Sequence, residues 1–357
     1  MRIRLRVDLF RMHGRETGRT GGHWVRRRKE ELCMLVPVLL FCVGLVLLIK
    51  GGDWFVDGAT GLAHRFHFPE LLIGATVVSI GTTLPEVMVS AQAALAHNSG
   101  ISYGNAIGSI ICNTSLIAAL TIAIRPSRVN PKTLRLPAIA FFIAAAFYMG
   151  ISYLTGRFER WHGILLLCGF VTYMVLTVLQ MKRRPEAGDA EEAEETQAKE
   201  KTLWQEIALL VVGAAAIAVG ANLLVDNGTK IAAALGVPDS VIGLTMVALG
   251  TSLPELVTAI TALAKGHSAL SLGNIIGANL FNLVLVSGAA ISISPFSIPA
   301  EKTLMGMNAS LVVDLPVMLG VMLILCVPAL LRGKLQRWQG ILLLCIYTAF
   351  TVFQFVS

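Results

Sequence analysis

Long apolar runs alternate with short polar connections along almost the entire chain. A helix needs about 20 mostly apolar residues to cross the hydrocarbon core of a membrane. From Met34 onward, runs of about this length recur ten times. The pattern therefore predicts ten membrane-spanning helices, at about residues 35–63, 70–96, 103–124, 134–153, 160–181, 204–234, 239–264, 271–293, 311–331 and 338–356.

The composition agrees with an all-α polytopic membrane protein. Hydrophobic residues make up 55% of the chain and charged residues only 14%, whereas a soluble protein has about 25% charged residues. The net charge of +7 comes mainly from residues 1–33, so it does not indicate a nucleic-acid partner. We expect residues 1–33 to be a basic extension, and a start codon assigned upstream of Met34 would account for it. The six cysteines have no paired spacing, so neither a disulfide framework nor a zinc site is predicted.

A polar segment at residues 182–203 divides the chain into two halves of five predicted spans each. It begins with Lys182-Arg183-Arg184-Pro185 and then becomes acidic, a composition typical of a disordered linker. The division gives a first five-helix repeat at residues 34–181 and a second at residues 204–357.

The two halves resemble each other in sequence. Residues 56–113 match residues 225–282 without a gap, at a constant offset of 169. Farther on, residues 160–168 match residues 337–345 at an offset of 177. Five is an odd number, so the halves enter the membrane in opposite senses. Two inverted five-helix repeats are typical of secondary transporters, whose substrate site lies at the repeat interface near the membrane midplane.

The charges of the loops predict the orientation. Loops after the odd-numbered spans carry most of the cations, whereas the opposite loops hold few. The positive-inside rule therefore places the central linker in the cytoplasm and both termini outside. The cations behind this prediction are Arg65, Arg125, Arg128, Lys132, Arg135, Lys182, Arg183, Arg184, Lys265, Arg332, Lys334 and Arg337.

One motif occurs at the same place in both repeats, as Gly81-Thr82-Thr83-Leu84-Pro85-Glu86 and as Gly250-Thr251-Ser252-Leu253-Pro254-Glu255. Each copy places a carboxylate inside an apolar run. An ionisable side chain at membrane depth is expensive and therefore indicates a functional site. A single glutamate could be a protonated structural residue, but a symmetric pair favours function.

The motif supplies oxygen atoms of three kinds. Thr82 and Thr83 precede Glu86 by four and three residues, so all three share one face of a helix. Pro85 has no N–H to bond the carbonyl of Gly81, so we expect the helix to bend or break there. The carbonyl, hydroxyl and carboxylate oxygens suit a hard cation such as Ca²⁺. The second motif repeats this set, with Pro254 at the corresponding break.

The helix after each motif adds further polar residues. Ser109 and Asn113 lie four residues apart in the first repeat, and Ala278 and Asn282 occupy these positions in the second. The nearby pair Asn105 and Asn274 fits helix capping or hydrogen bonding between helices.

With each motif followed by Gly-Asn-x-Ile-Gly-Ser/Ala, the chain from Met34 onward resembles the cation/calcium exchanger superfamily, and above all the prokaryotic sodium/calcium exchangers (calcium/sodium antiporters). The resemblance implies a Ca²⁺/Na⁺ antiporter of the prokaryotic plasma (inner) membrane, with no cofactor. It implies that Glu86 and Glu255 bind Ca²⁺ together with backbone oxygens at Thr82 and Thr251. The flanking sodium positions would be lined by Thr83, Ser109, Ser252, Asn113 and Asn282.

Two residues depart from well-known members of that superfamily. Asn282 stands where they have an aspartate, and Ala278 stands where they have a serine. Two carboxylates balance one Ca²⁺, two Na⁺ or two H⁺, but not three Na⁺. The sequence therefore leaves two reactions open. One is exchange of one Ca²⁺ for two Na⁺, and the other is exchange of Ca²⁺ or another divalent cation for protons.

A cation channel and a membrane enzyme are the alternatives to a transporter. A cation channel can also contain inverted repeats with broken helices, and saturable counterflow would distinguish the two. A membrane enzyme would need a nucleophile with an adjacent base. No histidine lies within the motifs, so no enzyme is expected.

Overall fold

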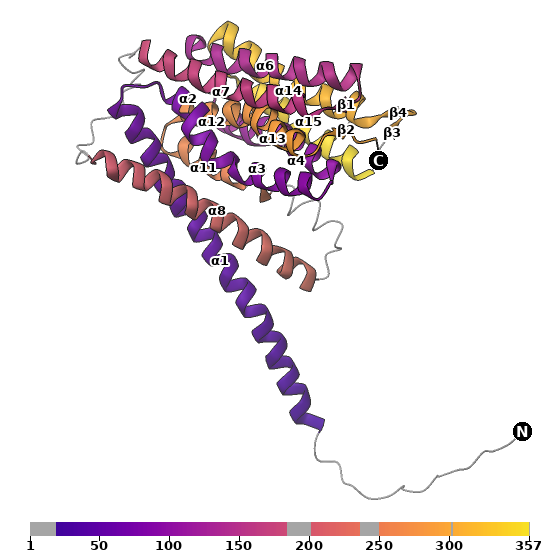
Figure 1. Ribbon diagram of the computed structural model, residues 1–357. Coiled ribbons are helices and arrows are strands. Elements are labelled where there is room, and N and C mark those ends of the chain that lie inside the picture. The colour runs from indigo at the N-terminus through magenta and orange to yellow at the C-terminus, as the bar shows by residue number, and fades with distance from the viewer. Residues whose placement is uncertain (1–18, 184–200, 236–249, 301–302, 357) are drawn as a thin grey trace, which may run out of the picture.

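The computed structural model describes residues 19–183, 201–235, 250–300 and 303–356, which form an almost entirely helical structure (Figure 1). The first half contains α1 (Arg19–Arg65), α2 (Glu70–Ile73), η1 (Gly74–Val78), α3 (Ser79–Leu95), α4 (Ser99–Cys112), η2 (Asn113–Ala118), α5 (Ala119–Ile124), α6 (Pro131–Leu154), β1 (Arg157–Phe158) and α7 (Arg160–Arg183). The second half contains α8 (Leu203–Ala234), α11 (Leu253–Ala264), α12 (Ser268–Phe281), η4 (Asn282–Val286), α13 (Ser287–Ile293), β2 (Phe296–Ser297), β3 (Thr303–Leu304), β4 (Met307–Asn308), η5 (Ser310–Asp314), α14 (Leu315–Arg332) and α15 (Arg337–Val356). The segments labelled η are π-helical turns.

The predicted all-α polytopic fold is confirmed. In the described residues, eight helical stretches are long and apolar enough to cross a membrane, and α11 and α15 occupy the two remaining predicted positions. Three predicted segments lie partly outside the described residues: 1–18 of the basic extension, 184–200 of the linker and 239–249 of the seventh span. α1 begins at Arg19, so the first span continues a helix that starts within the basic extension.

Local sequence signals explain where several helices begin. The Asn98 side chain accepts a hydrogen bond from the Ile101 amide at 3.0 Å and caps α4. The Asn130 side chain caps α6 in the same way, and Pro131 follows in the first turn. α8 begins with a capping box, in which Thr202 and Gln205 each bond the backbone N–H of the other. These caps satisfy amides that have no partner within the helix.

Equivalent contacts on opposite faces of the membrane show the inverted repeat. A backbone bridge joins Arg128, after the third span, to Lys334, after the ninth. The sequence offsets of 169 and 177 turn this pair into Ser297 and Arg157, and these two residues pair in the β1–β2 ribbon. The first pair follows odd-numbered spans and the second follows even-numbered spans, so the two contacts lie at opposite ends of the bundle.

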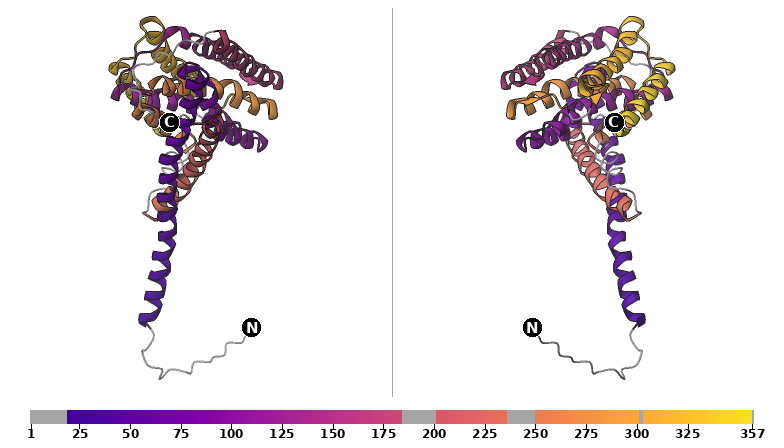
Figure 2. Two further views of the ribbon diagram at one scale, coloured as in Figure 1. Left: turned by 90° about the vertical axis from the view of Figure 1, so that its left-hand side faces the viewer. Right: turned by 90° about the vertical axis from the view of Figure 1, so that its right-hand side faces the viewer.

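The longest helices, α1 and α8, lie side by side and run obliquely to the other helices (Figure 1). Glycines allow their backbones to approach. A Cβ at Gly220 would lie 2.8 Å from the Gly44 carbonyl oxygen, and a Cβ at Gly213 would lie 2.8 Å from that of Gly51. The repeat offset of 169 relates these two contacts as well. Figure 2 shows that the first part of α1 extends beyond the bundle.

The centre of the bundle consists of the third and eighth spans. The stretches Ser99–Ile124 and Ser268–Ile293 are the most buried of the candidate spans. Both contain a π-helical turn, η2 and η4, that begins 169 residues apart at Asn113 and Asn282. The two spans pack against α3 and α11, which carry the repeated motifs, so the fold brings both motifs to its centre.

A candidate cation site between the two repeats

The two copies of the motif have different backbones. In the second copy, Thr251 and Ser252 form a turn and α11 begins at Leu253, with Pro254 in its first turn. In the first copy, α3 continues through Pro85 from Ser79 to Leu95, so the helix is not broken there. Tightly packed neighbouring helices can hold a membrane helix together around a proline. The helix break at this motif is therefore found in the second repeat and not in the first.

Glu86 and Glu255 are the centre of the candidate site. Both side chains are 0% exposed, and their four carboxylate oxygens have no hydrogen-bond partner among the described residues. The two carboxylates lie close enough to interact electrostatically. A buried carboxylate is tolerated only when it is paired, protonated or bound to a metal ion. This arrangement is therefore incomplete without a cation or protons.

Neutral polar groups surround the carboxylates. Four of the predicted ligands are buried, and their side chains likewise have no hydrogen-bond partner in the part of the chain that the structure describes. They are Thr83, Asn113, Ser252 and Asn282. Hydroxyl and amide oxygens that are neither solvated nor hydrogen-bonded are suited to coordinate a hard cation.

The π-helical turn of each repeat packs against the motif-bearing helix of the other repeat. The turn η2, which begins at Asn113, packs against α11, which carries Glu255. The turn η4, which begins at Asn282, packs against α3, which carries Glu86. Both repeats therefore contribute to one site.

The remaining predicted ligands have less uniform surroundings. Ser109 is buried at 5% exposure on α4, and Thr251 is partly buried. The Thr82 hydroxyl donates a hydrogen bond of 3.1 Å to Oδ1 of Asn274 on α12, so its side chain already has a partner. A hydroxyl that donates its proton keeps its lone pairs, so both the hydroxyl and the backbone oxygen of Thr82 can serve as cation ligands. The backbone oxygen is the one that the family resemblance implies.

Asn105 and Asn274 form the hydrogen bonds between helices that the sequence favoured. Asn105 on α4 donates to the Glu86 carbonyl at 3.0 Å and to the Ser90 hydroxyl at 2.8 Å. Oδ1 of Asn274 accepts from Thr82 and, at 3.3 Å, from Ser79. Both asparagines therefore hold α3, the helix that carries Glu86.

Sequence reasoning missed several positioning features. Ser79 and Ser90 lie seven residues before and four residues after Glu86, and their place on its helix face was a usable signal. The π-helical turns at Asn113 and Asn282 had no such signal. A π-helical turn widens the helix by one residue and frequently occurs at functional sites. In η4 the Ser287 hydroxyl donates to the Asn282 carbonyl at 2.9 Å and so stabilises the turn.

A small pocket connects the motifs to the long helices. Together with its open mouth, it contains about 200 Å³. Thr82, Pro85 and Pro254 line one side, and residues of α1 and α8, including Phe55 and Ile217, line the other. The candidate site therefore lies directly beside the α1–α8 pair.

Comparisons with known proteins agree with this architecture. The sequence model of the family described as "Sodium/calcium exchanger protein" matches residues 36–179 and 206–356. An uncharacterized membrane protein of Methanocaldococcus jannaschii is 37% identical over 318 residues, covering 88% of this chain and 96% of the relative. Sodium/calcium exchanger MaX1 of Methanosarcina acetivorans is 31% identical over 353 residues, covering 90% of this chain and 99% of the relative.

The fold also matches a solved exchanger structure. The sodium-calcium exchanger NCX_Mj, soaked with Na⁺ and Sr²⁺, superposes with a TM-score of 0.73 at 34% identity. The match covers 88% of this chain and 98% of that one. The matched family and the matched solved structure are exchangers, so the chain is an integral multi-pass transporter and not an enzyme. Its two inverted repeats, its paired motifs and the match over both halves show that this chain belongs to the sodium/calcium exchanger family of membrane cation exchangers.

Proposed function

We propose that this protein exchanges Ca²⁺ for Na⁺ across the membrane, at the central site formed by Glu86 and Glu255. The observation that carries the proposal is the pair of fully buried carboxylates whose four oxygens have no partner in the described structure. A divalent cation between them balances their charge and supplies the missing partners. The names of the exchangers MaX1 and NCX_Mj support Na⁺ and Ca²⁺ as the exchanged ions.

Ca²⁺ binds to the two glutamates and to the backbone oxygens of Thr82 and Thr251. Sodium ions occupy flanking positions lined by Thr83, Ser109, Ser252, Asn113 and Asn282. Four of these five side chains are buried and have no hydrogen-bond partner among the described residues, which supports their assignment. Both ions need the same two carboxylates, so they compete and bind in turn. The ions are cargo, and the exchange uses no cofactor.

Charge balance also couples binding to movement. A site that holds one Ca²⁺ or two monovalent cations is neutral, whereas the empty site carries two uncompensated negative charges. Moving bare charge through a low-dielectric interior is costly, so the empty site resists the conformational change. In alternating access, α1 and α8 slide across the bundle, and their close glycine contacts keep them together as one unit.

Exchange of Ca²⁺ for protons is the second candidate. Its specific support is Asn282, an amide where well-known exchangers have a carboxylate. Among the described residues, no group of three or more His, Cys, Asp or Glu side chains is placed to hold a metal ion. Two carboxylates can carry two protons as readily as two sodium ions, and either reaction would be electroneutral.

We further propose that the protein lies in a prokaryotic plasma (inner) membrane with the basic loops and the central linker in the cytoplasm and both termini outside. The charge asymmetry of the loops supports this orientation.

The test is ⁴⁵Ca²⁺ uptake into proteoliposomes loaded with either Na⁺ or protons. Uptake driven by an outward Na⁺ gradient and lost in both Glu86→Gln and Glu255→Gln supports sodium/calcium exchange. Uptake driven only by a proton gradient supports the second candidate. Glu159→Gln is the matched control, because Glu159 is an exposed glutamate in a salt bridge with Arg157. Uptake that does not saturate and that needs neither Na⁺ nor a proton gradient inside the proteoliposomes would indicate a channel.

A further inference from the structure

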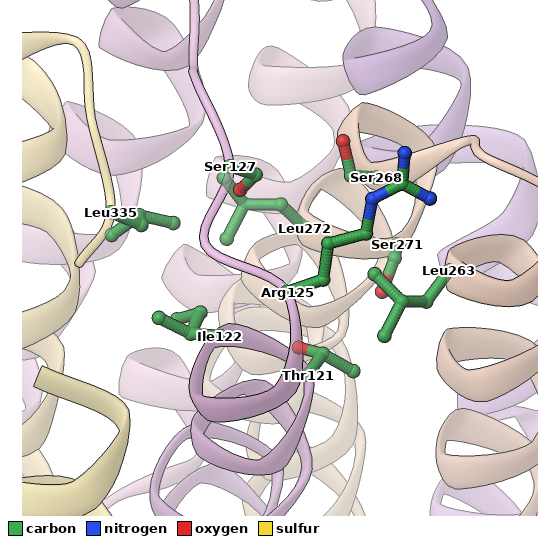
Figure 3. Close-up of a pocket in the computed structure, with 9 residues that line it drawn as sticks. All are labelled: Thr121, Ile122, Arg125, Ser127, Leu263, Ser268, Ser271, Leu272 and Leu335. Carbon is green, nitrogen blue, oxygen red and sulfur yellow. The ribbon is translucent and has the colours of Figure 1, made fainter. Parts of the chain in front are cut away.

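A second pocket, lined by both polar and apolar residues, lies at the membrane face that carries the loops after the third, seventh and ninth spans (Figure 3). It is lined by the end of α5, the end of α11, the start of α12 and the loop before α15. With its open mouth it contains about 260 Å³, less than the roughly 300–1,000 Å³ of a site for a drug-sized ligand. Its lining residues are Thr121, Ile122, Arg125, Ser127, Leu263, Ser268, Ser271, Leu272 and Leu335.

Arg125 and several hydroxyls supply the polar side-chain atoms of this pocket, and none of these side chains is acidic. Figure 3 shows the Arg125 guanidinium directed toward Ser268, the first residue of α12. The side chain of Arg125 forms no hydrogen bond or ion pair with the described residues. The first amides of a helix have no intrahelical partners and form its positive end. A guanidinium and a helix N-terminus therefore meet at one place, and an anion would satisfy both.

Ser271 provides an independent indication of a ligand. It lines the pocket one turn into α12, its side chain is 2% exposed, and its hydroxyl has no hydrogen-bond partner in the described structure. Buried hydroxyls normally have a partner. The amide of Ser271 bonds the His267 carbonyl, so the hydroxyl is the donor of Ser271 that has no protein partner in the described structure. The Glu70 carboxylate lies 2.8 Å from Nδ1 of His267, the residue before α12. It pairs with this histidine and not with Arg125.

The surrounding surface is basic. The loops beside the pocket and the adjoining helix ends carry seven cations that form no ion pair with a described acidic residue: Arg125, Arg128, Lys132, Arg135, Arg332, Lys334 and Arg337. By contrast, Arg65, Lys201 and Lys265 pair with acidic residues of α1 and α8. Clusters of unpaired cations at a membrane face attract anionic lipid headgroups.

We propose that this pocket binds a phosphate group, which is held by the Arg125 guanidinium, the Ser268 and Ser271 hydroxyls and the first amides of α12. The group can come from an anionic phospholipid headgroup or from phosphate in solution. Bound there, it fixes the start of α12, the helix that leads to Asn274 and Asn282 in the candidate cation site.

The test is thermal unfolding of the purified full-length protein in detergent, without Na⁺ or Ca²⁺ so that the cation site does not contribute. Short-chain phosphatidylglycerol is titrated in one arm and phosphatidylcholine in a second. A third arm compares potassium phosphate with potassium chloride at equal ionic strength. We expect phosphatidylglycerol to raise the unfolding midpoint by roughly 2 °C or more at saturation.

Three variants make the result specific. Arg125→Gln and Ser271→Ala should each weaken the response, by on the order of tenfold in the required lipid concentration. Arg135→Gln removes the same charge from the same face but outside the pocket, and should leave the response intact. A response to potassium phosphate that depends on Arg125 and Ser271 would support the proposal with a soluble source.

Two results would overturn the proposal. One is no midpoint shift with either phosphatidylglycerol or potassium phosphate. The other is a shift that Arg135→Gln weakens as much as Arg125→Gln while Ser271→Ala leaves it unchanged, since that pattern reports only the diffuse charge of the basic face. Ser271→Ala also remains informative if Arg125→Gln does not fold, because it removes only an unpartnered hydroxyl.

Discussion

Replacing either central glutamate by glutamine should abolish high-affinity Ca²⁺ transport without weakening the ion-free fold. At an effective dielectric constant of about 20, a unit charge pair about 4 Å apart gains about 4 kcal/mol, so a carboxylate and Ca²⁺ gain about twice that. Desolvation of both ions offsets part of this gain. Removing one partner of a buried ion pair costs about 3–5 kcal/mol in practice. We therefore expect Ca²⁺ affinity to fall by roughly two to four orders of magnitude in Glu86→Gln and in Glu255→Gln.

The expected effect on stability has the opposite sign. The four carboxylate oxygens are buried and have no partner among the described residues. An amide costs less to bury than a carboxylate, so the unfolding midpoint of the ion-free protein should stay the same or rise. Adding Ca²⁺ should stabilise the wild-type protein and have little effect on either variant.

The assay combines ⁴⁵Ca²⁺ uptake in proteoliposomes with thermal unfolding in a chelator and at rising Ca²⁺ concentrations. Glu159→Gln controls for the chemical change at an exposed position. If either variant keeps its Ca²⁺ affinity within tenfold of wild type, the two-glutamate site is wrong. If either variant unfolds at a markedly lower temperature without ions, the glutamate has a structural role and the reasoning from unpartnered oxygens fails.

Three further substitutions test the rest of the mechanism. Asn282→Asp adds a third carboxylate, so it should raise Na⁺ affinity and make exchange sensitive to membrane potential; potential-independent uptake at unchanged Na⁺ affinity would contradict this. Gly220→Val places side-chain atoms against the Gly44 carbonyl, so it should destabilise the protein by about 1–3 kcal/mol and slow transport, as measured by thermal unfolding and uptake. A cysteine pair at Gly52 and Thr261 should join α1 to α11 when oxidised, because a Cβ at Gly52 would lie 2.8 Å from the Thr261 hydroxyl. Oxidation should stop exchange and reduction restore it, whereas full activity in the oxidised form would rule out sliding of α1.

The spans and the two glutamates could be predicted because the membrane imposes simple rules on the sequence. Spanning helices need apolar runs of a set length, and a glutamate within such a run needs a compensating partner. The gapless register between the repeats then located equivalent residues, such as Asn113 and Asn282, which the structure places at the start of equivalent turns.

The backbone details at the site could not be predicted in the same way. Pro85 and Pro254 occupy identical motifs, yet α3 continues through Pro85 and α11 begins beside Pro254. A proline removes one hydrogen bond, but packing around the helix decides whether the helix stops. The π-helical turns have a similar origin, because they depend on how a whole helix fits its neighbours and not on one residue type.

The surroundings of the two motifs differ in a few hydroxyl groups. Asn105 and Asn274 are equivalent residues in the two repeats, but both hydrogen-bond to α3. Their partners there include Ser90 and Ser79, whose equivalents in the second repeat are alanines, at positions 259 and 248. The second motif therefore lacks the hydroxyl partners that hold the first. An exchanger with inverted repeats needs two equivalent halves that adopt different conformations at any one time. In this chain the difference is partly built into the sequence: the first repeat provides an anchored glutamate, and the second provides one on a helix that begins next to a turn.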